Sequence, residues 1–117
     1  MRKRTLTIRL MPDWRSGLRA AARKAQAKSY QGEELAFETP AVFFGKLTER
    51  RWALIRMLQG KGVLSIRELA RRVERDVKRV HEDVSVLTEL GLFEREEGGV
   101  VCPFARIHVD FELAAAA

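Results

Sequence analysis

Hydrophobic positions recur every three or four residues in two neighbouring segments of the chain, which predicts two amphipathic helices that share a core. The apolar positions are Ile66, Leu69, Ala70 and Val73 in the first segment, and Val77, Val80, Val84, Leu87 and Leu92 in the second. Ser65 followed by Glu68 fits a capping box at the start of the first helix. Asp76 is a plausible N-cap of the second helix, and Gly91 is a plausible stop signal.

A β-hairpin is predicted after the second helix. The β-forming segments 92–95 and 100–103 flank Glu96-Glu97-Gly98-Gly99, and a Gly-Gly turn between apolar segments is typical of a hairpin. Glu94, Glu96 and Glu97 surround Arg95, and phosphate groups would repel these carboxylates. If the chain binds DNA, we therefore expect the hairpin tip to stay outside the minor groove.

A third helix is expected before this pair, with Thr48 as its N-cap and its end near Gln59. Leu47, Leu54, Ile55 and Leu58 provide its inward positions. Arg50, Arg51 and Arg56 are assigned to solubility, although one of them could touch a phosphate.

The N-terminal part has a different pattern. Leu6, Ile8 and Leu10 alternate with polar residues, which predicts a strand, and Pro12 then introduces a helix to about Lys28 with Trp14 and Leu18 on its apolar side. A short strand follows at 33–38, and then an apolar segment at 41–47 whose Phe43 and Phe44 fit a core or a dimer contact.

The alternation of residues 107–113 predicts a last strand, which includes Val109 and Phe111. The first and last strands carry opposite charges, so we expect them to pair, within one chain or across a twofold axis. In that arrangement Arg9 or its neighbours would face Asp110 or Glu112. We accordingly divide the chain into an N-terminal basic strand-helix-strand extension for dimerisation or partner docking (1–46), a domain of helices and a hairpin (47–113) and an uninformative tail (114–117).

Composition agrees with one small α+β protein that has an anionic partner. The 117 residues are 46% hydrophobic and 32% charged, and the net charge is +6. Residues 1–31 hold nine Lys or Arg and one acidic residue, whereas residues 82–117 hold two and eight. The basic helix at 12–28 has three open interpretations: a solvated face, a second phosphate-contacting element, or a docking surface for an acidic protein.

Several classes of protein are disfavoured. Cys102 is the only cysteine and fits a buried structural thiol, while His81 and His108 lie far apart, so we expect no metal site and no cofactor. No paired acid and base, glycine-rich phosphate loop or oriented nucleophile is present, so we expect no catalytic residue and no enzyme. Basic patches without interleaved aromatic residues disfavour single-stranded RNA. No apolar run approaches the about 20 residues that span a bilayer, and no signal peptide is recognised, so we expect a cytoplasmic protein without membrane contact.

The segment from about Leu47 to Leu113 resembles the winged helix-turn-helix regulators of MarR-like type. More narrowly, Asp76-Val77-Lys78-Arg79-Val80-His81-Glu82-Asp83-Val84, followed by Leu87, Leu90, Gly91 and Leu92, is similar to a group of small prokaryotic and archaeal DNA-binding, antitoxin-like proteins. The resemblance implies a winged helix-turn-helix that binds double-stranded DNA, and a toxin-like protein partner in some members. Glu82 departs from the basic residue that is more usual at its position.

We therefore predict a sequence-specific regulator that binds a palindromic operator as a homodimer. It could also be the autoregulating antitoxin of a toxin-antitoxin pair. Base-reading residues would be Lys78, Arg79, Ser85, His81 and Glu82, and backbone-contacting residues would be Arg67, Arg71, Arg72 and Arg75. Dimer or partner contacts would involve Leu6, Ile8, Leu10, Trp14, Leu18, Val109 and Phe111. The alternative is a protein-binding adaptor or antitoxin that docks an acidic toxin-like protein and uses its winged helix mainly as a scaffold.

Overall fold

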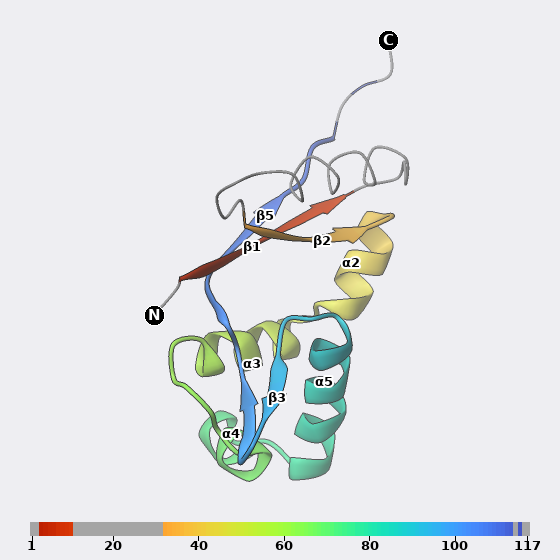
Figure 1. Cartoon of the computed structure of the whole chain (residues 1–117). Helices are drawn as coiled ribbons and strands as arrows, with labels where there is room; N and C mark the ends of the chain where they lie inside the picture. The colour runs from red at the N-terminus through yellow and green to blue at the C-terminus, as the bar shows by residue number, and fades with distance from the viewer. Residues whose placement is uncertain (1–2, 11–31, 114, 116–117) are drawn as a thin grey trace. The chain divides into compact units, whose positions relative to one another are not determined.

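The computed structural model describes residues 3–10, 32–113 and 115 as an α+β protein (Figure 1). Two compact units divide the chain. One contains residues 46–105, and the other combines the described residues before 46 with those after 105. The sequence-based division grouped residues 106–113 with the preceding domain, whereas in the structure they belong with the N-terminal strands. The predicted helix at 12–28 lies outside the described residues.

The first unit contains a three-stranded sheet with the order β2-β1-β5 (Figure 1). The central strand β1 (Arg4–Leu10) pairs in parallel with β2 (Glu33–Phe37), in a register that runs from Leu6 opposite Glu33 to Leu10 opposite Phe37. The alternation in β1 places Leu6 and Ile8 in the core. Both predicted N-terminal strands are therefore confirmed.

The pairing of the first and last strands is also confirmed, and it occurs within one chain. Strand β5 (Phe104–Asp110) lies beside β1 in the sheet. Arg9 Nη1 lies 2.7 Å from Asp110 Oδ2, and Arg9 Nε lies 3.1 Å from Glu34 Oε1. Strand β5 begins earlier than predicted, at the buried Phe104, and it ends at Asp110, before Phe111.

The apolar segment after β2 forms a helix, α2 (Pro40–Lys46), which the sequence analysis had left without a secondary structure. Pro40 suits the first helical turn, and the Thr39 hydroxyl accepts a hydrogen bond from Val42 N at 3.2 Å. The buried Phe43 ring makes edge contacts with Phe37 and Phe111, at centroid distances of 5.5 and 4.6 Å. The aromatic side chains thus form the apolar centre of this unit.

The second unit contains three helices and a hairpin: α3 (Glu49–Leu58), α4 (Ile66–Val73), α5 (Val77–Glu89), β3 (Glu94–Glu96) and β4 (Gly99–Val101). The three predicted N-caps are confirmed, since side chains of Thr48, Ser65 and Asp76 accept hydrogen bonds from backbone N–H groups three residues later. The α5 helix ends at Glu89 with Leu90 as its C-cap, and the predicted stop residue Gly91 follows with a left-handed φ of 86°.

The predicted apolar stripes form the core of this unit. Side chains from all three helices and the hairpin are fully buried, among them Leu54, Leu58, Leu69, Val80, Val84, Leu87, Phe93 and Val100. Val77, which was predicted to face inward, is instead 42% exposed because it opens α5 at the end of the packed face. Burial of such aliphatic side chains contributes about 1.5–3 kcal/mol each.

The hairpin is attached to the segment before α4. Glu94 pairs with Val101 in the antiparallel register, as predicted for a hairpin. Leu64 and Val100 exchange two backbone hydrogen bonds of 3.0 and 2.9 Å. Gly99 makes this approach possible, since a Cβ atom there would lie 2.0 Å from the carbonyl oxygen of Leu64.

Among the helices of the described residues, none combines the length and the apolar character needed to cross a membrane.

Candidate nucleic-acid interface

The α5 helix turns one side to the core and the opposite side to solvent. Val80, Val84 and Leu87 are buried on the inner side. Lys78, Glu82 and Ser85 follow at i, i+4 and i+7 on the outer side, where Lys78 and Glu82 are exposed and Ser85 is half-buried. The outer side therefore offers one ammonium, one carboxylate and one hydroxyl group.

Two further predicted base-reading residues border this outer side. Arg79 and His81 are both exposed, and helical geometry places them on opposite edges of it. The structure thus brings all five predicted base-reading residues onto the solvent side or its margins, without burying Lys78 or Arg79.

A three-residue turn, residues 74–76, connects α4 to α5. Glu74 adopts a left-handed conformation with φ 55°, and Arg75 N donates to Ala70 O at 3.0 Å, which closes the end of α4. Asp76 then caps α5 by accepting from Arg79 N at 3.2 Å. These backbone bonds fix the direction in which α5 leaves α4.

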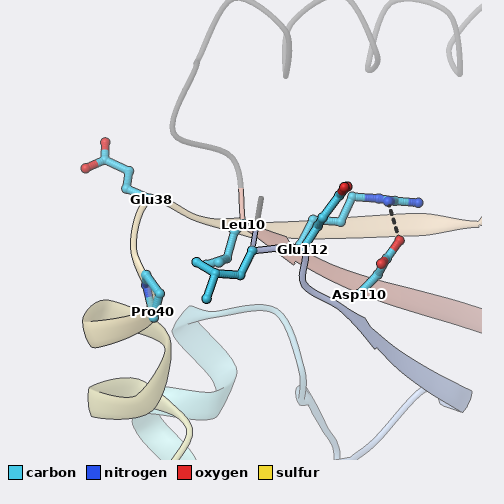
Figure 2. A pocket seen from close by; sticks show the side chains of 7 residues that line it. Leu10, Glu38, Pro40, Asp110 and Glu112 are labelled. Atoms are coloured by element: carbon cyan, nitrogen blue, oxygen red, sulfur yellow. Dashed lines mark hydrogen bonds and ion pairs between the residues drawn. The ribbon is translucent and has the colours of Figure 1, made fainter. Parts of the chain in front are cut away.

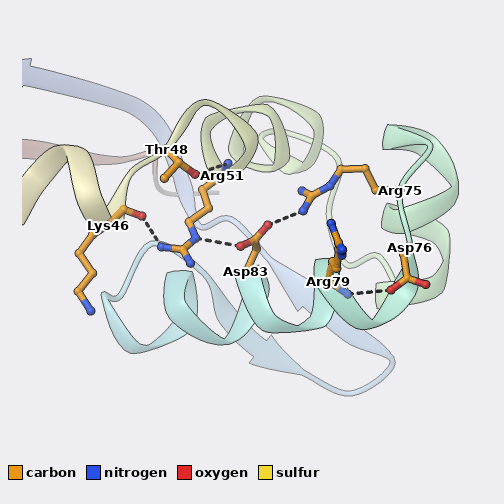
Figure 3. Close-up of polar contacts among 7 residues, drawn as sticks. All are labelled: Lys46, Thr48, Arg51, Arg75, Asp76, Arg79 and Asp83. Atoms are coloured by element: carbon orange, nitrogen blue, oxygen red, sulfur yellow. Dashed lines mark hydrogen bonds and ion pairs between the residues drawn. The ribbon is translucent and has the colours of Figure 1, made fainter.

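An ion-paired cluster that the sequence analysis missed links α5 to α3 and to this turn. The carboxylate of Asp83 accepts hydrogen bonds from Arg51 Nε at 2.9 Å and from Arg75 Nη2 at 2.7 Å (Figure 3). The side chains of Arg51, Asp83 and Arg75 are only 19%, 15% and 19% exposed. The position of Asp83 directly before the buried Val84 indicated that its carboxylate would lie close to the core. The sequence did not indicate its partners, because they lie on other elements.

The cluster holds Asp83 in its ionised form. Burial acts to raise the pKa of Asp83, but hydrogen bonds from Arg75 and Arg51, with their positive charges, outweigh it and lower the pKa below its usual value. Arg51 also donates to the carbonyl oxygen of Lys46 at 2.8 Å. Arg75, a predicted backbone-contacting residue, is therefore engaged within the protein through one of its nitrogens.

Beside this cluster lies an open hollow of about 560 Å³, lined by Arg50, Arg75, Asp76 and Arg79. Figure 3 shows the side chain of Arg75 extending toward Asp83, and Asp76 bonded to the backbone N–H of Arg79 at the start of α5. Arg50 and Arg79 form no side-chain hydrogen bond or ion pair with any residue that the structure describes. Arg75 Nη1 is inaccessible to solvent and has no hydrogen-bond partner among those residues.

The other predicted backbone-contacting residues are on α4, and all three are exposed. Arg71 donates to Glu68 through Nε, at 2.9 Å from Oε2, and Arg72 Nε lies 3.8 Å from Glu68 Oε1. The hydrogen bond from Arg71 lowers the pKa of Glu68, although burial opposes it, and the same bond raises the pKa of Arg71. The negative charge of Glu68 therefore offsets part of the positive charge of Arg71 and Arg72. Arg67 makes no ion pair with a described residue.

The predicted dimer or partner contacts belong to the first unit, where the structure describes five of the seven. Leu6 and Ile8 are buried inside the chain, Leu10 and Phe111 are half-buried, and Val109 is 40% exposed. Trp14 and Leu18 lie outside the described residues. A second hollow, of about 520 Å³, is lined by Arg9, Leu10, Glu38, Pro40, Asp110, Glu112 and Leu113 (Figure 2).

A family model named HVO_A0114 matches residues 46–109, which is more than half of the chain. The chain belongs to the HVO_A0114 family. The searches of curated proteins and of solved structures gave no match. The HVO_A0114 segment begins at the first residue of the second unit and continues into β5, so it includes the hollow and the whole of α5.

Within this HVO_A0114 protein, the residues that the structure describes contain no group of three or more His, Cys, Asp or Glu that could hold a metal ion. Cys102 is buried, and burial raises the pKa of its thiol, which disfavours the reactive thiolate. The exposed arginine and lysine side chains of α5 and its surroundings can form hydrogen bonds and bind negative charge.

Proposed function

We propose that this HVO_A0114 family protein is a sequence-specific double-stranded DNA-binding transcriptional regulator. The observation that carries the proposal is the exposed outer side of α5, with Lys78 at its centre and Arg79 at its edge, on a helix fixed by buried valines and a capped turn. A second helix held in this way after a short turn is typical of a helix-turn-helix, in which the N-terminal part of that helix contacts base edges.

The surrounding elements suit a winged helix-turn-helix of the MarR-like type. In this proposal α4 and α5 form the helix-turn-helix, α3 supports them, and β3–β4 is the wing. The wing carries exposed Glu94, Glu96 and Glu97 around Arg95, so it would not insert into a minor groove.

Each polar residue of α5 has a proposed role. Lys78 would donate to guanine, Ser85 would donate or accept, and Glu82 would accept from the amino group of cytosine. Arg79 and His81 would act at the margins. Arg67, Arg71 and Arg72 would bind phosphates and position the helix without choosing a sequence.

We further propose a homodimer that binds a palindromic operator. Two copies of α5 would then lie about 34 Å apart, one helical turn of DNA. If each subunit neutralises about three to four phosphates, the slope of log affinity against log salt should be about −5 to −7 for the dimer, at about −0.9 per phosphate.

Selection of bound fragments from random duplex DNA at physiological salt tests this function. We expect a palindromic consensus, and Lys78→Ala should reduce discrimination at one base pair by about 1–3 kcal/mol. Arg67→Ala serves as the matched variant, because loss of a phosphate contact should weaken all sequences equally. Recovery of unselected sequence by the wild-type protein would contradict the proposed function.

Exposed apolar side chains favour a second candidate function, a protein-binding adaptor or antitoxin. Phe44 and Val42 of α2 are 64% and 44% exposed in the first unit. Exposed aromatic side chains are enriched at protein interfaces. Copurification of an acidic toxin-like protein with the wild type, and its loss in the Phe44→Ser variant, would support this role. Elution of both the wild type and the variant as monomers without a partner would argue against it.

A further inference from the structure

The hollow beside α5 contains more positive charge than the protein itself neutralises. Arg50, Arg75 and Arg79 line it, and Asp76 is its one acidic lining residue. Asp83 neutralises part of the charge of Arg75, but it is shared with Arg51. Including Arg51 and Asp83, four guanidinium groups thus face two carboxylates in this region.

The arginines of the hollow also have unused hydrogen-bond donors. Arg50 and Arg79 make no side-chain hydrogen bond with any described residue. Arg75 Nη1 is buried and lacks a partner in the described part of the chain. Because that atom is inaccessible to solvent, the donors that a ligand in the hollow can reach are those of Arg50 and Arg79, and Arg75 contributes its positive charge.

The position of the hollow also favours the binding of an anion. Asp76 caps the first turn of α5, so the hollow lies at the positive end of the helix dipole. Guanidinium groups bind phosphate through paired N–H donors, and several of them around one hollow suit a tetrahedral oxyanion. Asp83 holds the guanidinium of Arg75 in place through the 2.7 Å bond to Nη2 (Figure 3), so the positive charge of Arg75 stays beside the hollow.

We propose that Arg50, Arg75 and Arg79 form a binding site for one phosphate group of the DNA backbone. This inference rests on the proposed function and revises it at one residue: Arg79 anchors the backbone and does not read a base. Asp83 is a positioning residue for Arg75. The site joins α3 to the start of α5, so one phosphate fixes how deeply α5 enters the groove.

The test measures binding of the full-length protein to its selected duplex and to an unrelated duplex, over a range of salt concentrations. Arg50→Gln and Arg79→Gln are the main variants, because neither side chain supports the fold through an ion pair with a described residue. Because the proposed dimer holds two such sites, each variant should weaken both duplexes about 30-fold at 0.15 M salt and reduce the salt slope by about 1.8, at about 0.9 per phosphate. Arg50→Lys and Arg79→Lys, which retain the charge, should retain the slope.

Arg56→Gln is the matched control, because Arg56 is an exposed cation of the same helix as Arg50 and lies outside the hollow. Its slope should equal that of the wild type. Wild-type slopes in Arg50→Gln and Arg79→Gln would overturn the phosphate site while leaving the proposed function intact. A loss in Arg79→Gln confined to the selected duplex would return Arg79 to base reading and also overturn the site.

An NMR titration with inorganic phosphate tests the hollow independently of DNA. Side-chain Nε–H resonances of Arg50, Arg75 and Arg79 should shift with phosphate but not with chloride at equal ionic strength, and Arg56 should not shift. Absence of selective shifts would overturn the site. If the wild-type protein bound no duplex, the proposed function and the DNA phosphate as occupant would both be rejected, even with such shifts.

Discussion

Replacing Asp83 with asparagine should destabilise the protein by about 2 kcal/mol at pH 7. Asp83 accepts hydrogen bonds at 2.9 and 2.7 Å from two arginines, and all three side chains are more than four-fifths buried. Removing one partner of a fully buried ion pair costs about 3–5 kcal/mol. Asparagine retains one acceptor, and the residual exposure weakens the electrostatic part, so we expect a smaller loss of about 1–3 kcal/mol.

The effect should depend on pH in one direction. The pKa of Asp83 is lowered in the folded protein, so its carboxylate stabilises the fold above the unfolded pKa of about 3.9. That contribution declines as the pH falls below this value and disappears below the folded pKa. The difference between wild type and Asp83→Asn should therefore shrink on acidification from pH 5 to pH 2.

Urea denaturation followed by far-ultraviolet circular dichroism at several pH values measures this difference. Glu82→Gln is the control, because Glu82 is the neighbouring carboxylate on α5 and is exposed. It should change the free energy of unfolding by less than about 0.5 kcal/mol. A difference for Asp83→Asn that is equally small at pH 7, or one that stays constant down to pH 2, would refute the role assigned to the ion-paired cluster.

Three further predictions concern other parts of the chain. Gly99→Ala should cost about 2–4 kcal/mol in urea denaturation, because its Cβ would displace the Leu64 carbonyl, whereas Gly45→Ala, with open space around it, should not destabilise. Cys102 should react with a thiol reagent much more slowly in the folded protein than in urea, and equal rates would contradict its burial. Arg9→Gln should lower the free energy of unfolding by less than about 1 kcal/mol, because the ion pairs of Arg9 are exposed. This loss should become smaller with added salt, and a larger, salt-independent loss would contradict the prediction.

Local signals in the sequence predicted the elements that depend on neighbouring residues. The caps at Thr48, Ser65 and Asp76, the Gly91 stop and the hairpin were all confirmed, because each involves contacts within a few residues. The α2 helix was missed because seven residues beginning with proline give too short a periodic pattern.

The candidate site depended on contacts that the sequence pattern does not contain. Asp83 meets Arg51 from 32 residues away, so charge counting alone assigned Arg51 to solubility and Arg75 to a free phosphate contact. The sequence correctly predicted that Lys78 and Arg79 would remain exposed, since both lie off the valine stripe. The grouping of Arg79 with Arg50 around one hollow required the packing of α3 beside α5.

The route of β5 has a consequence for the order of folding during synthesis. The second unit is one continuous stretch of chain, residues 46–105, so all of its partners emerge from the ribosome together. The first sheet instead joins Arg9 to Asp110, across 101 positions of sequence, and loop closure over that separation is slow. We expect the second unit to fold first, and the β5 side of β1 to remain unpaired until the last strand has been synthesised.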